Sequence, residues 1–253
     1  MKNCIRFKQE FRCYLAILLL AGASSCAKQL RPVKAEAAYF KIDGTGGADS
    51  SIIAFIHPYR DSLRKEMTEV VAISSIMMEK GKPESLLGNF VADLLLEKGK
   101  QYDSAADCCI LNYGSLRLPF LPAGEITKGM IYELMPFDNF LVLIELRGEV
   151  VRQLLDYIAF QGGWPVAGIK FKIRDGKSFD ILINDLPLQP GKIYRVVISD
   201  YLADGGDNLS MLRNEKRKNF GIFIRDVILE YLKEQTQQGK LISSQLDNRI
   251  MIE

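Results

Sequence analysis

The sequence predicts an α/β fold with a mixed sheet, α+β in character, formed by a single globular domain after an N-terminal targeting segment and a tether. Helix-like and strand-like patterns alternate along the 253 residues, and the middle of the chain holds two adjacent strand-like stretches typical of a hairpin. The composition, 48% hydrophobic and 25% charged, is ordinary for a globular protein with a sizeable core.

The N-terminus has the pattern of an export signal. Four basic residues precede an apolar stretch at 13–23 that is too short to span the ~30 Å hydrocarbon core of a bilayer. Small residues then lead to Cys26, which is typical of a bacterial lipoprotein signal. We therefore predict that residues 1–25 are removed and that Cys26 is lipidated. A plain secretory signal with an incidental Cys26 is the alternative.

Residues 26–47 are mostly polar, end in glycines and predict a flexible tether, so the globular domain is expected at 48–253. The leader carries four Lys or Arg and one Glu, a net +3, so that the +2 of the whole chain becomes −1 after its removal. The mature chain therefore lacks the basic excess of a nucleic-acid-binding protein.

The first half of the domain predicts two helices and two strands. Residues 48–67 have a helical pattern apart from Pro58, and 68–78 read as a strand. Residues 84–100 predict a helix, because one face gathers the apolar side chains of Leu86, Leu87, Phe90, Val91, Leu94 and Leu95. Residues 107–114 predict a short buried strand that ends in a turn.

Three further elements are expected before the hairpin. Residues 124–135 predict a short helix with Thr127 as its N-cap. Residues 140–146 predict an apolar strand, and 147–161 a helix that directly follows it.

The hairpin and two last elements complete the domain. Residues 167–174 alternate apolar and polar side chains as a half-buried strand does, and 179–184, continued by 185–188, predict its hairpin partner. Residues 192–207 predict a strand that ends in a glycine turn, and 221–239 predict a closing amphipathic helix.

The domain offers little catalytic chemistry. His57 is the single histidine, too few for a dinuclear metal site or an independent phosphatase centre. Neither a nucleophile elbow nor a phosphate-binding glycine loop occurs. Cys108 and Cys109 are neighbours that would point to opposite faces of a strand, so we expect buried thiols without a disulfide. We expect no catalytic residue, metal or cofactor in this chain.

Several motifs in one order resemble the C-terminal, substrate-binding domain of 5′-nucleotidases, a group that includes periplasmic UDP-sugar hydrolase and ecto-5′-nucleotidase. The resemblance implies a single 5′-nucleotidase C-terminal-like domain. It lies in 84–93 (ESLLGNFVAD), 112–117 (NYGSLR), 124–127 (GEIT), 134–148 (LMPFDNFLVLIELRG), 168–173 (GIKFKI) and 194–209 (YRVVISDYLADGGDNL).

The resemblance also implies a division of labour. Full enzymes of the family carry an N-terminal metallophosphatase domain with two metals and a catalytic Asp–His pair, whereas the C-terminal domain grips the nucleoside. We expect this chain to be the binding half alone and inactive by itself. Divalent metals are then expected only in a separately encoded metallophosphatase.

The family motif assigns three site residues to the first loop. Asn112 and Arg117 match an Asn and an Arg that contact the base or nearby oxygens, and their amide and guanidinium suit that task. Gly114 is expected to let the backbone turn tightly. The alternative is a turn residue and a salt-bridge residue that hold no ligand.

The second loop supplies the remaining assignments. Tyr201 matches an aromatic that stacks on the base, and Asp207 a carboxylate that binds the ribose hydroxyls. Gly205 and Gly206 are expected to let this loop fold close to the ligand. Phe140 is the candidate for a second stacking aromatic. Without a ligand, Tyr201 would be a core aromatic and Asp207 a turn residue.

Three departures from the family bear on binding. Pro83, beside Lys82, stands where the family often has an arginine. The register from Arg147 backwards puts Leu141 at the position of the second aromatic and Phe140 one place earlier. Tyr113 replaces a small residue and is expected near the ligand.

These features support three hypotheses of function. The first is the nucleoside- or nucleotide-binding half of a split 5′-nucleotidase. The second is a surface lipoprotein that captures nucleosides without an enzyme partner, and the third is a scaffold that has lost binding. All three place the chain outside the cytoplasm of a bacterium, lipid-anchored on the periplasmic or cell-surface side, with no nucleic-acid partner.

Overall fold

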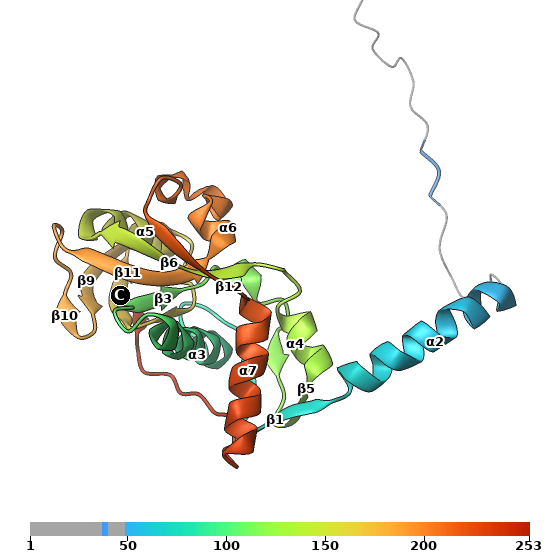
Figure 1. The fold of residues 1–253 in the computed structure, drawn as a ribbon. Coiled ribbons are helices and arrows are strands. Elements are labelled where there is room, and N and C mark those ends of the chain that lie inside the picture. The colour runs from blue at the N-terminus through green and yellow to red at the C-terminus, as the bar shows by residue number, and fades with distance from the viewer. Residues whose placement is uncertain (1–36, 40–48) are drawn as a thin grey trace, which may run out of the picture. The chain divides into compact units, whose positions relative to one another are not determined.

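The computed structural model describes residues 37–39 and 49–253, and Figure 1 shows its fold. The predicted signal, the predicted lipidation site Cys26 and most of the predicted tether lie outside the described residues. All helices and strands described below belong to one compact unit, Ser50–Glu253.

A five-stranded mixed sheet forms the centre of the domain (Figure 1). Its order is β12-β6-β11-β3-β7, where β11 runs parallel to β3 and antiparallel to β6. The strands are β12 (Arg217–Phe223), β6 (Phe140–Arg147), β11 (Ile193–Ser199), β3 (Cys108–Ile110) and β7 (Val166–Ala167).

The two faces of this sheet carry separate apolar cores, because successive strand residues point to opposite sides. On one side Cys109 and Val197 pack with α3 (Leu86–Tyr102) and α7 (Ile224–Gln237). The prediction for the thiols is confirmed: both are free and buried, and burial raises the pKa of each.

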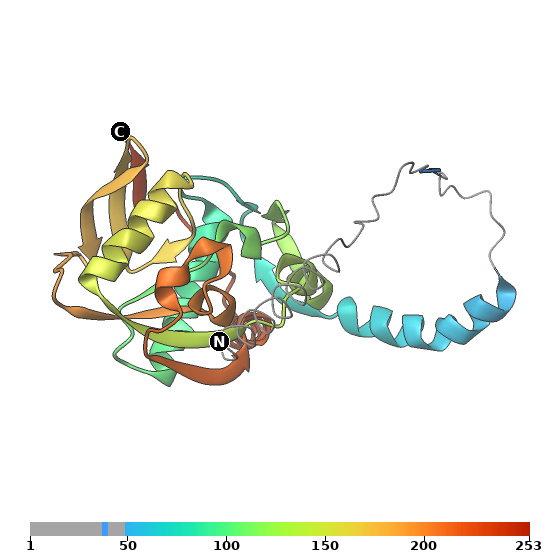
Figure 2. The same ribbon diagram turned by 90° about the horizontal axis from the view of Figure 1, so that it is seen from above.

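The other core contains Cys108 and Val196 and is closed by α5 (Gly148–Phe160) and a second sheet. That sheet has the order β10-β9-β8-β13, and Figure 2 shows α5 beside it. Its strands are β8 (Ile169–Arg174), β9 (Lys177–Ile183), β10 (Leu186–Pro187) and β13 (Ile250–Ile252). Antiparallel pairing of β8 with β9 confirms the predicted hairpin.

The predicted strand at 68–78 is two strands, β1 (Val70–Ser74) and β2 (Met78–Glu79). A turn separates them, in which the Ser74 hydroxyl donates to the Ile76 carbonyl at 2.7 Å. β1 pairs with β5 (Gly124–Thr127) and β2 with β4 (Phe120–Leu121). The segment therefore contributes one strand to each of two small sheets.

Two predicted helices begin later than expected. Residues 124–127 form β5, and α4 (Lys128–Leu134) follows, with the Thr127 hydroxyl accepting from the Met130 amide at 3.3 Å. The prediction of Thr127 as an N-cap is confirmed. Residues 221–223 belong to the edge strand β12, so α7 begins at Ile224.

The glycine turn after β11 contains a further helical turn, α6 (Asp200–Ala203), which the strand-and-turn prediction missed. The Ser199 hydroxyl accepts from the Leu202 amide at 3.2 Å and thereby caps it. The strand consequently ends at Ser199, and Tyr201 lies on α6.

The first helix of the unit is α2 (Ser50–Met67), which confirms the helical pattern predicted at 48–67 and continues through Pro58. None of its residues is buried, and Glu66 near its end pairs with Lys128 of α4. Within the described part of the chain, no helix is both long and apolar enough to cross a membrane.

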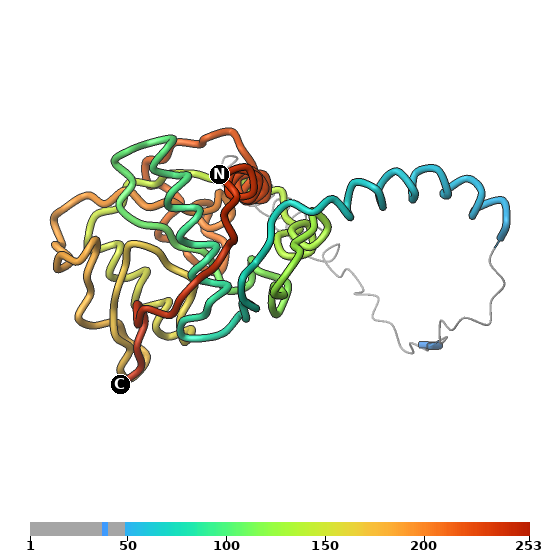
Figure 3. Tube along the Cα trace, turned by 90° about the horizontal axis from the view of Figure 1, so that it is seen from below, coloured from blue at the N-terminus to red at the C-terminus, as the bar shows by residue number. Residues whose placement is uncertain are grey.

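The C-terminal segment returns from α7 to place β13 beside β8, as Figure 3 shows in red. Arg249, only 7% exposed, holds this segment in place. Its guanidinium donates to Asp93 at 2.7 Å, to the Val166 carbonyl at 2.8 Å and to Asp247 at 2.8 Å. The segment is therefore joined to both α3 and β7.

Replacing Arg249 tests whether its guanidinium holds the C-terminal segment against α3 and β7. We expect Arg249→Ala to lower the free energy of unfolding by about 2–4 kcal/mol, because a buried carbonyl and two carboxylates lose their donor. Both carboxylates are partly exposed, which keeps the loss below that of a fully buried pair. Urea denaturation measures it, with Arg60→Ala on the exposed α2 as the control, expected to change stability by about 0.5 kcal/mol or less. Equal stabilities of the two variants would contradict the assignment.

Candidate functional site

The topology of the central sheet brings three loops to one edge. Because β11 and β3 are parallel, their carboxyl ends lie at the same edge, where the antiparallel β6 begins. The segment after β3 carries Asn112 to Arg117, the segment after β11 carries Tyr201 to Asp207, and Phe137 and Asn139 precede β6. The sheet thereby gathers residues that are far apart in the sequence.

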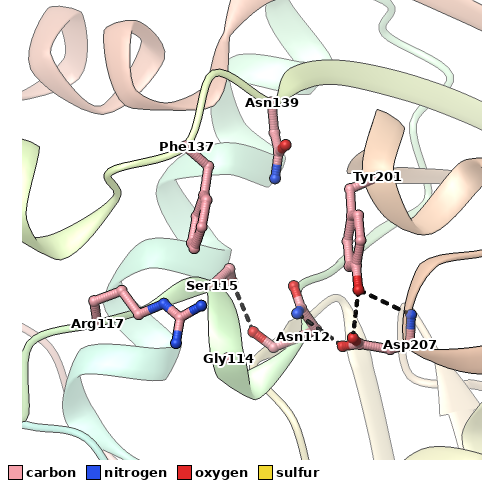
Figure 4. Close-up of a pocket in the computed structure, with 8 residues that line it drawn as sticks. All are labelled: Asn112, Gly114, Ser115, Arg117, Phe137, Asn139, Tyr201 and Asp207. Carbon is pink, nitrogen blue, oxygen red and sulfur yellow. Dashed lines mark hydrogen bonds between the residues drawn. The ribbon is translucent and has the colours of Figure 1, made fainter. Parts of the chain in front are cut away.

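These loops enclose a pocket of about 260 Å³ (Figure 4). Five of the eight residues that the sequence assigned to substrate binding line it. The lining residues are Asn112, Gly114, Ser115, Arg117, Phe137, Asn139, Tyr201 and Asp207.

Asp207 is the centre of the hydrogen bonds in this pocket (Figure 4). The Tyr201 hydroxyl donates to its Oδ1 at 2.7 Å, and the Asn112 amide donates to its Oδ2 at 2.8 Å. The Asp207 backbone N–H in turn donates to the Tyr201 hydroxyl at 3.1 Å. Donation to the carboxylate raises the pKa of Tyr201. Each carboxylate oxygen keeps acceptor capacity for a ligand hydroxyl.

Asn112 presents a second polar group. It is 7% exposed, and its Oδ1 has no hydrogen-bond partner among the described residues. Its backbone carbonyl accepts from the Ser115 hydroxyl at 2.6 Å, which fixes the loop. A buried acceptor without a partner is costly unless a ligand or water supplies a donor.

Two aromatic rings face each other across the pocket, Phe137 and Tyr201 (Figure 4). The Arg117 guanidinium lies 4.9 Å from the centre of the Phe137 ring. It makes neither a hydrogen bond nor an ion pair with any residue that the structure describes. A planar, partly unsaturated ring would fit between the aromatic faces, with a rigid donor at its edge.

The structure does not bring Phe140 into the pocket. Phe140 is the first residue of β6 and lies opposite Phe223 of β12, and their rings stack with centroids 4.6 Å apart. Phe137, three residues earlier, holds the place across from Tyr201. Phe137 belongs to the family segment 134–148, but a register counted back along the strand does not predict the path of the loop that precedes the strand.

The two glycines of the second loop shape the pocket without lining it. Gly205 has a left-handed backbone, φ 86°. A Cβ on Gly206 would lie 2.5 Å from carbons of the Tyr201 ring, so a side chain there would displace the ring. Both glycines therefore allow close packing within the loop, and that they bring the loop close to a ligand stays a prediction.

The first loop differs from expectation in two respects. Gly114 lies in a 3₁₀ turn, Tyr113–Ser115, and is not in the left-handed region, so the turn does not itself require glycine. Tyr113 does not line the pocket, and the ammonium groups of Lys80 and Lys82 lie 3.9 and 4.8 Å from its ring centre. The bulky residue therefore leaves the pocket open.

The residues that the structure describes contain no cluster of three or more His, Cys, Asp or Glu side chains able to hold a metal ion. His57 lies on α2, where its Nδ1 is 3.1 Å from an Asp61 oxygen. The pocket can thus bind through stacking, hydrogen bonds and one guanidinium.

Comparison with known proteins gives one consistent result. Residues 66–214, more than half of the chain, match the family described as 5′-nucleotidase, C-terminal domain. A 5′-nucleotidase of Vibrio vulnificus is 25% identical over 202 residues, which are 74% of this chain and 35% of that protein. A cell wall protein of Listeria monocytogenes is 28% identical over 185 residues, which are 66% of this chain and 23% of that protein. The chain thus spans a minor part of these relatives.

A solved structure shares the fold. The 5′-nucleotidase precursor from Thermus thermophilus superposes with a TM-score of 0.66 and 24% identity. The match covers 80% of this chain and 42% of that one. This likeness confirms the predicted fold class, a mixed α/β domain.

The contact between Gly206 and Tyr201 is open to a direct test. We expect Gly206→Ala to lower the free energy of unfolding by about 1–3 kcal/mol, because the added methyl group collides with the ring. Chemical denaturation measures the change. Gly191→Ala is the matched control, since its Cβ would meet no described atom within 4 Å and its φ is not positive. If both alanine variants were equally stable, Tyr201 would not be held as described.

Proposed function

The chain belongs to the family of 5′-nucleotidase C-terminal domains, and from this premise we propose that it is the nucleoside- or nucleotide-binding half of a split 5′-nucleotidase. One observation carries the proposal: a single pocket combines two facing aromatic rings with the Asp207 carboxylate and the Asn112 amide. The two rings suit a base and the carboxylate suits the ribose hydroxyls, while the Asn112 amide orients that carboxylate and keeps its Oδ1 for the base.

In this proposal the base lies between Phe137 and Tyr201. Stacking on an aromatic ring contributes on the order of 1–3 kcal/mol per base and tolerates any base. The unpartnered Asn112 Oδ1 accepts from an amino or imino group of the base. The Arg117 guanidinium donates to a ring nitrogen or a carbonyl oxygen at its edge.

The ribose then lies toward Asp207. Its hydroxyls donate to the carboxylate oxygens, whose orientation is already fixed by Tyr201 and Asn112. A carboxylate held by two donors before binding loses little freedom when the ligand arrives, which favours affinity.

Hydrolysis is assigned to a separately encoded metallophosphatase. Binding of base and sugar by this chain would position the phosphate for that partner, and positioning alone lowers a reaction barrier substantially. The leader and Cys26 support a lipid anchor that holds the chain on the periplasmic or cell-surface side of a bacterial membrane. The resemblance to a cell wall protein supports an exported location.

The alternative is a lipoprotein that captures nucleosides without an enzyme partner. It requires only the groups that line the pocket, two aromatic rings with an amide, a carboxylate and a guanidinium, which suit binding without catalysis. Both hypotheses predict that the pocket binds a nucleoside, but only the first requires a phosphatase partner.

The first prediction concerns the base. We expect Phe137→Leu to weaken adenosine binding about tenfold, because one stacking face is lost. Phe140→Leu is the matched control and should leave the affinity unchanged, since that ring stacks on Phe223 outside the pocket. Calorimetric titration of the purified chain measures both, with thermal melting to verify folding. A larger loss from Phe140→Leu would contradict the assignment of the pocket.

The second prediction concerns the split enzyme. The purified chain alone should release no phosphate from AMP, because the chain has a single histidine. Adding a metallophosphatase-domain protein encoded beside it should raise phosphate release above that of the phosphatase alone. The Phe137→Leu chain should raise it less. Release that does not change on adding the native chain would favour the capture protein.

A further inference from the structure

The first turn of α7 holds the loop that carries Phe137. This loop, residues 135–139, connects α4 to β6 and has no regular secondary structure. α7 lies beside α4 (Figure 1). The Ile224 amide donates to the Asn139 carbonyl at 2.9 Å, and the Arg225 side chain contacts the rest of the loop. Two neighbouring residues of one helix therefore fix a segment that lacks a regular structure of its own.

The guanidinium of Arg225 makes three hydrogen bonds to this loop. Its Nη2 donates to the Asp138 carboxylate at 2.7 Å, and its Nη1 donates to the carbonyls of Met135 and Phe137, each at 3.4 Å. The two carbonyl bonds are long, so the charged bond to Asp138 is the strong one. Because the guanidinium is planar and its donors have fixed directions, a shift of one acceptor disturbs the bonds to the others.

The same guanidinium is enclosed by its surroundings. The Arg225 side chain is 11% exposed, and its central carbon lies 4.4 Å from the centre of the Tyr132 ring of α4. A cation over an aromatic face is attracted to it. The Arg225 Nε is buried and has no hydrogen-bond partner among the described residues. A buried donor without a partner is costly, so the other contacts of this side chain must offset that cost.

Arg225 also stands where its own helix does not favour it. It is the second residue of α7, and the helix dipole disfavours a cation in the first turn. The next residue, Asp226, has the charge that this turn favours. Both costs indicate that Arg225 does not serve the stability of α7 itself. Its contacts with the loop and with Tyr132 are what offset them.

The loop matters because it brings an aromatic ring to the nucleoside pocket. Phe137 and Asn139 line that pocket, and the Phe137 ring faces Tyr201 across it (Figure 4). Arg225 does not line the pocket, yet it is bonded to the carbonyl of Phe137 itself. A gap of about 0.5–1 Å already forfeits a quarter to a half of the dispersion attraction between two atoms. Stacking on both faces of a base therefore requires that the loop be held firmly.

We propose that Arg225 is a positioning residue for the base, which holds Phe137 at the distance from Tyr201 where a base fits between the two rings. The inference rests on the proposed function of this pocket. Arg225 acts through the backbone of the loop and touches no ligand. Arg117, by contrast, lines the pocket and can contact the ligand directly.

Calorimetric titration with adenosine tests this role. We expect Arg225→Gln to weaken binding about fivefold, less than the loss of about tenfold expected for Phe137→Leu, because a displaced ring keeps part of its stacking. Arg174→Gln is the matched control and should leave the affinity unchanged. That guanidinium also pairs with a carboxylate, Glu253, and lies 4.4 Å from the centre of an aromatic ring, Phe179, but on the second sheet. An unchanged affinity in Arg225→Gln, or an equal loss in Arg174→Gln, would overturn the proposal.

A double-mutant cycle separates positioning from general damage to the fold. In a chain that already carries Phe137→Leu, adding Arg225→Gln should weaken adenosine binding less than about twofold, because little stacking is left to misplace. A loss of about fivefold in both backgrounds would show that Arg225 only supports the fold.

Asp138→Ala keeps the test open if Arg225→Gln does not fold, which thermal melting detects. The Asp138 side chain is 72% exposed, so its removal should leave the fold intact. Without its strong partner the guanidinium holds the loop less firmly, and adenosine should bind about twofold more weakly, though not in the Phe137→Leu background. An unchanged affinity in Asp138→Ala would contradict the role of Arg225.

Crystal structures of the native chain, Arg225→Gln and Arg174→Gln decide the matter without a ligand. The Phe137 ring should be displaced or lack density in Arg225→Gln and keep its place in Arg174→Gln. A ring that keeps its place in Arg225→Gln would overturn the proposal. If adenosine does not bind the native chain, the proposed function fails, and this comparison of structures then decides by itself whether Arg225 positions Phe137.

Discussion

The hydrogen-bonded register of β11 between β3 and β6 is the constraint on which the rest of the structure depends. Val196 lies opposite Cys108 and Ile144, so its side chain belongs to one core and that of Val197 to the other. A slip by one residue would exchange the two cores. The same register sets the edge at which the strands end, and it therefore places Asn112 beside Asp207. Stability and binding geometry follow from one set of backbone hydrogen bonds.

The sequence was sufficient where local pattern and burial agree. The helix at 84–100 and the strand at 140–146 were predicted because their apolar periodicity is long and unbroken, and both are present as α3 and β6. Tyr201 and Asp207 were predicted to share a site, and the structure joins their side chains directly. The position of a short segment that directly follows a strand can be predicted from the position of that strand.

The sequence was insufficient where position depends on distant partners. Phe137 and Phe140 are only three residues apart in the sequence. The Phe140 ring nevertheless stacks on Phe223 of β12, whereas the Phe137 ring lines the pocket. β13 is also absent from the local pattern, because it exists only through its pairing with β8, nearly eighty residues earlier in the chain. Tyr113 does not line the first pocket, and the ammonium groups of two lysines lie against its ring, which its place in the motif did not predict.

The adjacent thiols of Cys108 and Cys109 have a consequence for a chain that folds in an oxidising compartment, as proposed. Once β3 is in place, each thiol is sealed in a different core and little of it ionises, so neither oxidant nor a second cysteine can react with it. Only the unfolded chain exposes them. The extent of oxidation therefore depends on the rate of folding relative to the rate of thiol oxidation. A chain that folds slowly would accumulate cross-linked molecules, whereas a chain that folds fast would not.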